Sequence, residues 1–244
     1  MKINSPQFNL MHKACLKASR VLIRDFGEVE KLQVSEKGPG DFVTASDKRV
    51  EGIIIKELEK SEYSILSEET GLIEGKNKDK KWIIDPIDGT FNFLNGLPHF
   101  AISIAYEDKS EIISGIIFDP IKNEMFYAEK NSGSFFNNRR IRVSKKDNLQ
   151  DCLFATNHEG AISSKLNLRY TGCAALDLAY VSCGRLDGYF HNKINVWDVA
   201  AGVLIIKEAG GKVNDINKFD MNSINIRASN NNIYNKMLEN LDNF

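Results

Sequence analysis

Residues 82–90 are Trp-Ile-Ile-Asp-Pro-Ile-Asp-Gly-Thr. The apolar run 82–84 is typical of a buried strand, and two acids, Asp85 and Asp88, follow it. Carboxylates at the end of a core strand are unfavourable unless a positive charge pairs with them. Mg²⁺ takes oxygen ligands and often shares its shell with a substrate phosphate, so this stretch indicates metal-assisted phosphate chemistry. The alternative is that both acids only cap a turn or a helix.

Length and composition define the broad class of protein. The 244 residues suffice for one large domain or two smaller ones with a sizeable core. Hydrophobic residues make up 42% and charged residues 27% of the chain, as in soluble globular proteins. The formal net charge of −1 provides no overall field for nucleic acid or an anionic membrane, so we expect no direct nucleic-acid binding.

Targeting features and cysteine usage indicate the cytoplasm. No apolar run approaches the roughly 20 residues that span a bilayer, and the first residues lack the apolar core of a signal peptide. The cysteines show no zinc spacing and are interpreted as buried reduced thiols; they are Cys15, Cys152, Cys173 and Cys183. Reduced thiols fit a reducing compartment, so we expect a cytoplasmic protein without membrane contact.

The region before residue 82 combines helical and extended patterns. Apolar residues at helical spacing predict a helix over 8–26. Glycine and proline in 37–40 indicate a loop, and a second helix is expected to begin near 44–47. A short strand is predicted over 63–67, and the polar, lysine-rich segment 71–81 is interpreted as a loop.

Downstream of residue 90 the pattern changes to short β-rich runs separated by turns. These runs predict an antiparallel meander with strands at 100–106, 111–118, 124–129 and 134–137. The charged segment 139–150 is interpreted as a boundary between an N-terminal α+β subdomain, 1–145, and a C-terminal α/β subdomain, 146–244. Beyond it we expect strands at 152–156, 186–190, 212–214 and 224–228, and helices at 174–182, 196–209 and 231–241.

Two further acids, Glu68 and Asp198, also adjoin apolar runs. Glu68 follows a predicted strand, and Asp198 opens an apolar helix. The ends of strands are where α/β proteins usually place their sites. If all four acids converge there, they would hold two divalent ions about 4 Å apart.

A phosphate site is expected just after Asp88. Residues 91–94 form a plausible helical turn, and free backbone N–H groups at a helix start bind phosphate. Gly89 permits close approach, and the Thr90 hydroxyl could orient an attacking water. In the simpler alternative, Thr90 is only an N-cap.

Long segments of the chain resemble a known family. Residues 85–93 are similar to the first signature of the inositol monophosphatase family, which belongs to the Mg²⁺-dependent, lithium-sensitive phosphatases. Residues 197–202, followed by 208–211, resemble its second signature. Further segments resemble the family in its own order, namely 38–47, 67–69 and 172–179. The likeness covers nearly the whole chain.

The resemblance implies a fold and an activity. The fold would be α/β, a layered αβαβα sandwich of the sugar-phosphatase type, with the metal site in the cleft between two subdomains. The activity would be Mg²⁺-dependent hydrolysis of inositol 1-phosphate or a related polyol phosphate, by a homodimer. Histidinol phosphate, fructose 1,6-bisphosphate and adenosine 3′,5′-bisphosphate are alternative substrates. A regulatory role in transcription through protein partners, as in relatives of the extragenic-suppressor type, is the alternative of another class.

The resemblance also implies roles for individual residues. Two to three Mg²⁺ ions would be held by Glu68, Asp85, the carbonyl of Ile87, Asp88 and Asp198. Thr90, backed by Asp47 and with Glu68, would activate the attacking water. The substrate would contact Asp88, the N–H groups of Gly89 and Thr90, the loop Gly172, Cys173 and Ala174, and also His191 and Asp198. Lys37 matches a basic residue near the metal loop.

Two features depart from the family pattern. His191 occupies a position seven residues before Asp198 where the family often has a glutamate that binds inositol hydroxyls. A histidine offers different donors and acceptors, which bears on the identity of the alcohol. The segment 157–168 is shorter than in relatives, which usually have a helix there. We expect a more open substrate entrance or a different quaternary contact.

Overall fold

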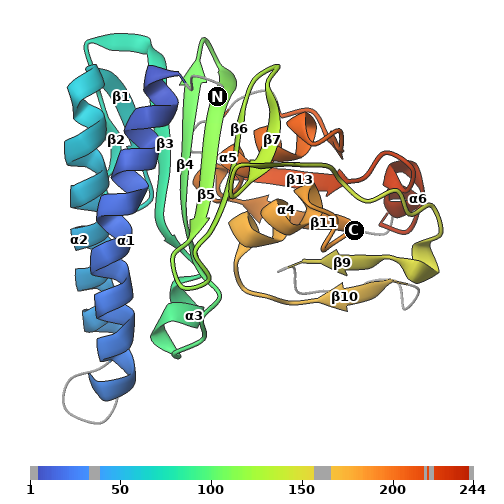
Figure 1. Cartoon of the computed structure of the whole chain (residues 1–244), viewed down its shortest axis with the longest axis horizontal. Coiled ribbons are helices and arrows are strands. Elements are labelled where there is room, and N and C mark those ends of the chain that lie inside the picture. Colours follow the sequence, from blue (N-terminus) through green and yellow to red (C-terminus); the bar gives the residue numbers. More distant parts are fainter. Residues whose placement is uncertain (1–4, 33–38, 157–165, 217–218, 220–222, 242–244) are drawn as a thin grey trace.

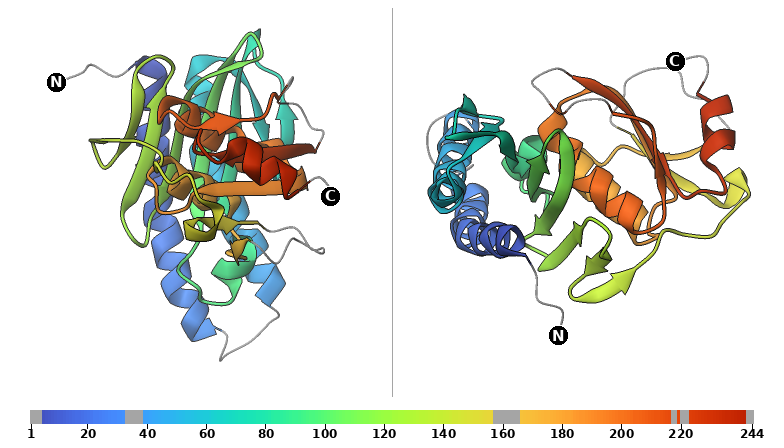
Figure 2. Two further views of the ribbon diagram at one scale, coloured as in Figure 1. Left: turned by 90° about the vertical axis from the view of Figure 1, so that its right-hand side faces the viewer. Right: turned by 90° about the horizontal axis from the view of Figure 1, so that it is seen from above.

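The fold alternates layers of helix and sheet. The structure is a computed structural model that describes residues 5–32, 39–156, 166–216, 219 and 223–241, with backbone alone at 30–32 and 39–44. Helices α1 (Pro6–Leu32) and α2 (Pro39–Leu58) form one outer layer (Figure 1). An eight-stranded sheet follows, and helices α4 (Ala174–Ser182) and α5 (Val196–Glu208) lie between it and a five-stranded sheet. Helix α6 (Tyr234–Glu239) covers the far side (Figure 2), which confirms the predicted αβαβα order.

The first sheet contains the predicted meander. Its strands, in spatial order, are β2 (Gly71–Ile73), β1 (Tyr63–Ser67), β3 (Asn77–Asp88), β4 (Ala101–Asp108), β5 (Glu111–Asp119), β6 (Glu124–Glu129), β7 (Gly133–Phe136) and β8 (Arg139–Ile141). All neighbours are antiparallel except β1 and β3, which are parallel. The meander over β4 to β7 is confirmed, and β8 is an additional edge strand.

The second sheet is mixed and carries the C-terminal part of the chain. Its spatial order is β10 (Asn167–Arg169), β9 (Leu153–Ala155), β11 (Gly188–Ile194), β13 (Ile224–Ser229) and β12 (Lys212–Val213). The pairs β10–β9 and β9–β11 are parallel, and the pairs β11–β13 and β13–β12 are antiparallel. The chain passes from one sheet to the other between Ile141 and Leu153, within or next to the charged segment 139–150.

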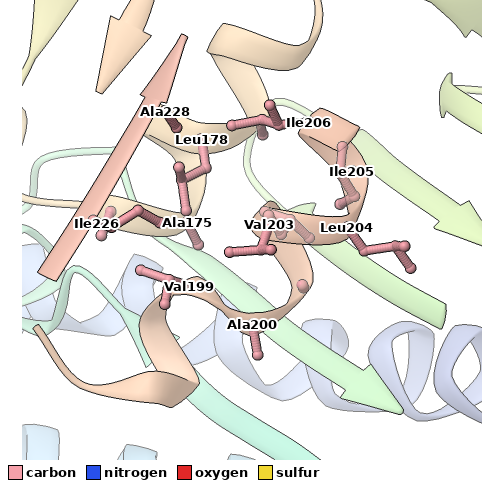
Figure 3. Packing of buried hydrophobic residues seen from close by; sticks show 14 of the residues in the cluster. Ala175, Leu178, Val199, Ala200, Val203, Leu204, Ile205, Ile206, Ile226 and Ala228 are labelled. Carbon is pink, nitrogen blue, oxygen red and sulfur yellow. The ribbon is translucent and has the colours of Figure 1, made fainter. Parts of the chain in front are cut away.

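Two hydrophobic cores cover the two faces of the first sheet. One packs α1 and α2 onto it around Trp82, and the other packs α4 and α5 between the sheets. Figure 3 shows this second core, to which α4 contributes Leu178 and α5 contributes Val203. The two helices approach closely at Gly202, which has no side chain. A Cβ added there would lie 2.5 Å from Leu178 Cδ1. Among the described helices, none combines the length and hydropathy of a membrane span.

The structure corrects two predictions. Residues 71–81 are not one loop, since 71–73 form β2, 77–81 begin β3, and only 74–76 connect the two strands. The polar residues of this part of β3 are accommodated in a strand because they pair with opposite charges on β4. Lys80 faces Asp108 and Lys81 faces Glu107, with Nζ–O distances of 3.9 and 3.1 Å. Helix α2 begins at Pro39, so the loop predicted over 37–40 is wrong at its last two residues. Proline suits the first turn of a helix because backbone N–H groups there have no acceptor within the helix, so the absence of one costs no hydrogen bond.

Candidate metal centre

The strand pairing of the first sheet brings the acids together. Strand β1 runs parallel to β3 with Ser67 opposite Ile84, and the Glu68 N–H donates to the Ile84 carbonyl at 3.3 Å. Glu68 therefore leaves β1 at the level where Asp85 follows on β3. Asp85 itself pairs with Ser103 of β4. The Ser103 hydroxyl lies 3.4 Å from the Trp197 carbonyl, which places Asp198, in the first turn of α5, beside this position.

Three carboxylates form a compact group. One oxygen each from Asp85, Asp88 and Asp198 lies within 4.8 Å of the other two. Asp85 and Asp88 are buried, and Asp198 is half-buried. Glu68 is exposed and lies outside this group, but its carboxylate is within hydrogen-bonding range of Asp85. The acids singled out in the sequence thus meet at one edge of the sheet.

The electrostatics of this group call for a cation. Burial, and then the neighbouring acids, raise the pKa of Asp85 and of Asp198 well above the ordinary value. The pKa of Glu68 is raised as well, because its carboxylate loses part of its hydration and lies among other acids. Acids that repel one another in a desolvated place hold protons unless a positive ion replaces them. An all-oxygen set of this kind fits a hard divalent cation such as Mg²⁺.

Asp88 is held from the far side by α4. Its Oδ2 accepts hydrogen bonds from the Ala175 N–H at 2.5 Å and from the Cys173 thiol at 3.1 Å. Burial raises the pKa of Asp88 to about 6, while these donors work in the opposite direction. Cys173 and Ala174, predicted to contact the substrate, are buried, and the Cys173 thiol faces Asp88.

The loop before α4 is shaped by Gly172, which the resemblance singled out, and by Asn92, Thr171 and Asp177, which sequence reasoning missed. Gly172 is exposed with φ of +79°, and a Cβ there would lie 3.0 Å from Asn92 Nδ2. The Asn92 amide donates to the carbonyls of Thr171 and His99, both at 2.8 Å. The Thr171 hydroxyl in turn donates to Asp177 at 2.8 Å. Asn92 lies inside the first signature, which was the only signal that could have identified it.

A tight turn connects the acids to the predicted phosphate site. The Ile87 N–H donates to Asp85 Oδ1 at 3.0 Å, and the Thr90 hydroxyl donates to the Ile87 carbonyl at 2.8 Å. Gly89 precedes the short helix α3 (Thr90–Leu94) with φ of +92°. Its added Cβ would lie 3.0 Å from the His99 carbonyl oxygen, so only glycine fits without strain.

Asp47, on α2, lies close enough to Glu69, Glu68 and Glu51 to interact with their charges. It is buried, and its burial together with Glu69, Glu68 and Glu51 raises its pKa to about 8. The Thr90 hydroxyl donates its hydrogen bond to the Ile87 carbonyl, so the interaction of Asp47 with Thr90 stays a prediction. Such a high pKa makes Asp47 suitable for proton exchange near neutral pH.

The remaining predicted residues are placed as follows. His191 is half-buried on β11, where its carbonyl accepts a hydrogen bond from Arg227 at 2.9 Å. Lys37 and most of the short segment, 157–165, lie outside the described residues.

Comparison with known proteins agrees with this geometry. The profile of the Inositol monophosphatase family matches residues 4–243. The chain is 44% identical over 229 residues to an inositol-1-monophosphatase of Mesorhizobium japonicum, covering 87% of this chain and 86% of the relative. It is 40% identical over 243 residues to Nus factor SuhB of Haemophilus influenzae, covering 93% of this chain and 90% of the relative.

Structural similarity extends over the same length. A crystal structure of extragenic suppressor protein suhB from Bartonella henselae aligns with a TM-score of 0.86 at 40% identity, covering 98% of this chain and all of that one. Both the sequence match and the fold therefore span nearly the whole chain. The chain belongs to the inositol monophosphatase family.

Proposed function

We propose that this protein hydrolyses a small phosphate monoester in a Mg²⁺-dependent reaction. The observation that carries the proposal is the convergence of Asp85, Asp88 and Asp198 from β3 and α5 within 4.8 Å. Membership of a family that is named after a phosphatase supports it. Glu68 and the Ile87 carbonyl would complete the ligand set with these three acids. When bound, Mg²⁺ would neutralise phosphate charge and supply an activated water.

The residues of the chain would orient the reacting groups. The bond from Ala175 fixes the Asp88 carboxylate, so this ligand is positioned before substrate arrives. The Thr90 hydroxyl donates its hydrogen bond to the Ile87 carbonyl. The lone pairs of its oxygen would then accept a hydrogen bond from the attacking water. Asp47, whose pKa is raised by burial and by the neighbouring acids, would accept the proton that the water releases once bound cations offset the charge of those acids. Positioning and charge neutralisation carry most of the acceleration in phosphoryl transfer.

Inositol 1-phosphate is the first substrate to test. Relatives that cover most of the chain carry the name inositol-1-monophosphatase. His191 stands in place of the glutamate expected to bind inositol hydroxyls, so a related polyol phosphate is included in the same proposal. Backbone N–H groups of Gly89 and Thr90 would hold the phosphate, and the exposed Gly172 would contact the alcohol.

A substrate panel tests this proposal. Phosphate release is measured from inositol 1-phosphate, glycerol phosphate, histidinol phosphate, fructose 1,6-bisphosphate and adenosine 3′,5′-bisphosphate, with Mg²⁺, with chelator and with added Li⁺. We expect Mg²⁺-dependent, Li⁺-inhibited release that is fastest from inositol 1-phosphate or another polyol phosphate. Absence of Mg²⁺-dependent release from every member would overturn the enzymatic proposal.

A regulatory role is the second candidate, because several relatives at 38–41% identity carry the name Nus factor SuhB. A pull-down from lysate separates it from catalysis if wild type and Asp85→Asn are compared. A partner of the transcription machinery that both retain supports a binding role independent of chemistry, whereas absence of any such partner argues against it. The homodimer is also a proposal, and light scattering coupled to gel filtration tests it.

A further inference from the structure

A second buried acid on α2 lies one helical turn after Asp47. Glu51 is 4% exposed, and its hydrogen-bond partners among the described residues are all uncharged. Its Oε1 accepts from the Ser67 hydroxyl and from the Thr70 N–H at 3.1 Å. Its Oε2 accepts from the Thr70 hydroxyl at 2.5 Å. Within the described part of the chain, burial of this carboxylate is therefore stabilised by uncharged hydrogen-bond donors.

These donors flank one short segment. Ser67 is the last residue of β1, Thr70 immediately precedes β2, and only Glu68 and Glu69 lie between them. The two oxygens of Glu51 thus hold both ends of the turn that carries Glu68. A third restraint comes from β3, where the Ile84 carbonyl accepts the Glu68 N–H at 3.3 Å. The side chain of Glu68 is itself exposed, so the position of its carboxylate depends on how rigidly this turn is held.

We propose that Glu51 is a positioning residue that places Glu68 for metal binding. This inference rests on the proposed function, because it assigns to Glu68 the role of a metal ligand. Groups that orient metal ligands from behind typically change metal affinity or activity by about 10- to 100-fold when they are removed. The side chain of Glu51 acts through hydrogen bonds to Ser67 and Thr70, and it makes no contact with the metal in this assignment.

The same helix offers a matched control. Glu57 is also buried on α2, at 3% exposed, and it also has several partners. Its partners, however, are the ammonium groups of Lys17, of Lys60 at 2.7 Å and of Lys13 at 3.5 Å. These lysines lie on α1 and just after α2, not on the turn that carries Glu68. Removal of the Glu57 carboxylate should therefore affect stability alone.

The test measures Mg²⁺ affinity by calorimetric titration of the purified full chain, beside turnover of the best substrate. Glu51→Ala should weaken Mg²⁺ binding about 10-fold or more. Glu51→Gln should stay within about 3-fold of wild type, because one amide oxygen still accepts two bonds and its NH₂ can donate to the Thr70 hydroxyl. Glu57→Ala should lower the melting temperature and leave Mg²⁺ affinity unchanged.

A double-mutant cycle with Glu68→Ala separates positioning from general loosening of the fold. In the Glu68→Ala background, Glu51→Ala should have no further effect on Mg²⁺ affinity. Wild-type affinity in Glu51→Ala, or an equal loss in both backgrounds, would overturn the inference. Should Glu51→Ala fail to fold, Thr70→Val and Ser67→Ala each remove one of its bonds and must weaken binding in the same Glu68-dependent way. Wild type that binds no Mg²⁺ would overturn the proposed function itself.

Discussion

The backbone N–H of Ala175 donates a hydrogen bond of 2.5 Å to Asp88 Oδ2. Asp88 ends a strand of the first sheet, whereas Ala175 lies in the first turn of a helix between the sheets. The start of a helix carries free N–H groups and a partial positive charge, which favour a carboxylate. One ligand of the proposed metal centre is therefore fixed by an element outside its own sheet, and the geometry of the centre depends on the packing of α4.

The raised pKa of Asp47 predicts a pH-dependent stability without metal. Its pKa is about 8 in the folded chain and ordinarily 3.8, so the folded state binds this proton more tightly than the unfolded state. This contribution is complete below pH 4 and disappears as the pH rises through 8. We expect Asp47→Asn to be more stable than wild type by at least about 1 kcal/mol at pH 8 in chelator.

Urea unfolding at pH 5 and pH 8 in chelator measures this effect. The advantage of Asp47→Asn over wild type should grow between the two pH values. The other acids of the centre also have raised pKa values, so wild type and variant should both lose stability as the pH rises. The free energy of unfolding should fall less steeply with pH in the variant. Equal slopes in the two proteins would show that Asp47 is ionised at both pH values.

Gly89→Ala should damage both stability and activity. Its φ of +92° disfavours any side chain, and the new Cβ would lie 3.0 Å from the His99 carbonyl oxygen and 3.3 Å from Cys173 Cβ. Gly71→Ala is the matched control, because Gly71 has φ of +74° and nothing within 4 Å. We expect the control to lose about 1–2 kcal/mol from backbone strain alone.

Gly89→Ala should lose more than this control and should also lose most of its turnover, since the turn between Asp88 and Thr90 must shift. Chemical denaturation and phosphate release measure the two effects. Equal stability of the two variants, with turnover retained in Gly89→Ala, would contradict the close packing of this turn.

The close approach of α4 and α5 predicts opposite effects for two glycines in helices. Gly202→Ala places its Cβ 2.5 Å from Leu178 Cδ1 and should cost about 1–3 kcal/mol through overpacking. Gly27 lies in α1 with nothing within 4 Å, so Gly27→Ala should stabilise by about 0.5–1 kcal/mol. Thermal unfolding compares them. A stabilising Gly202→Ala would indicate that the helices are farther apart than the structure shows.

The main acids of the site could be predicted because their signals are local. Asp85 and Asp88 directly follow an apolar strand, and Asp198 opens an apolar helix. Glu68 joins them because β1 and β3 are parallel neighbours, so that their ends meet at the same edge. The layer order followed from the resemblance together with the alternation of helical and extended patterns.

The supporting residues could not be predicted from local patterns. Glu51 resembles an ordinary acid of an amphipathic helix, and it is buried only because Ser67 and Thr70, distant in sequence, supply donors. The bond from Ala175 involves a backbone N–H and leaves no mark in the sequence. The polar start of β3 has the sequence pattern of a loop because the residue that pairs with the charge of Lys81, Glu107, lies in another strand.

The most direct test of the metal centre is Mg²⁺ binding and phosphate release from inositol 1-phosphate, measured side by side for wild type and Asp85→Asn. Asp85 is 1% exposed and near-isosteric with asparagine, so we expect the variant to keep the wild-type melting temperature in chelator or exceed it. Its Mg²⁺ affinity and its turnover should both fall by at least about 100-fold, because a ligand shared by the ions is lost. Near-normal turnover of Asp85→Asn at saturating Mg²⁺ would contradict the metal centre described here.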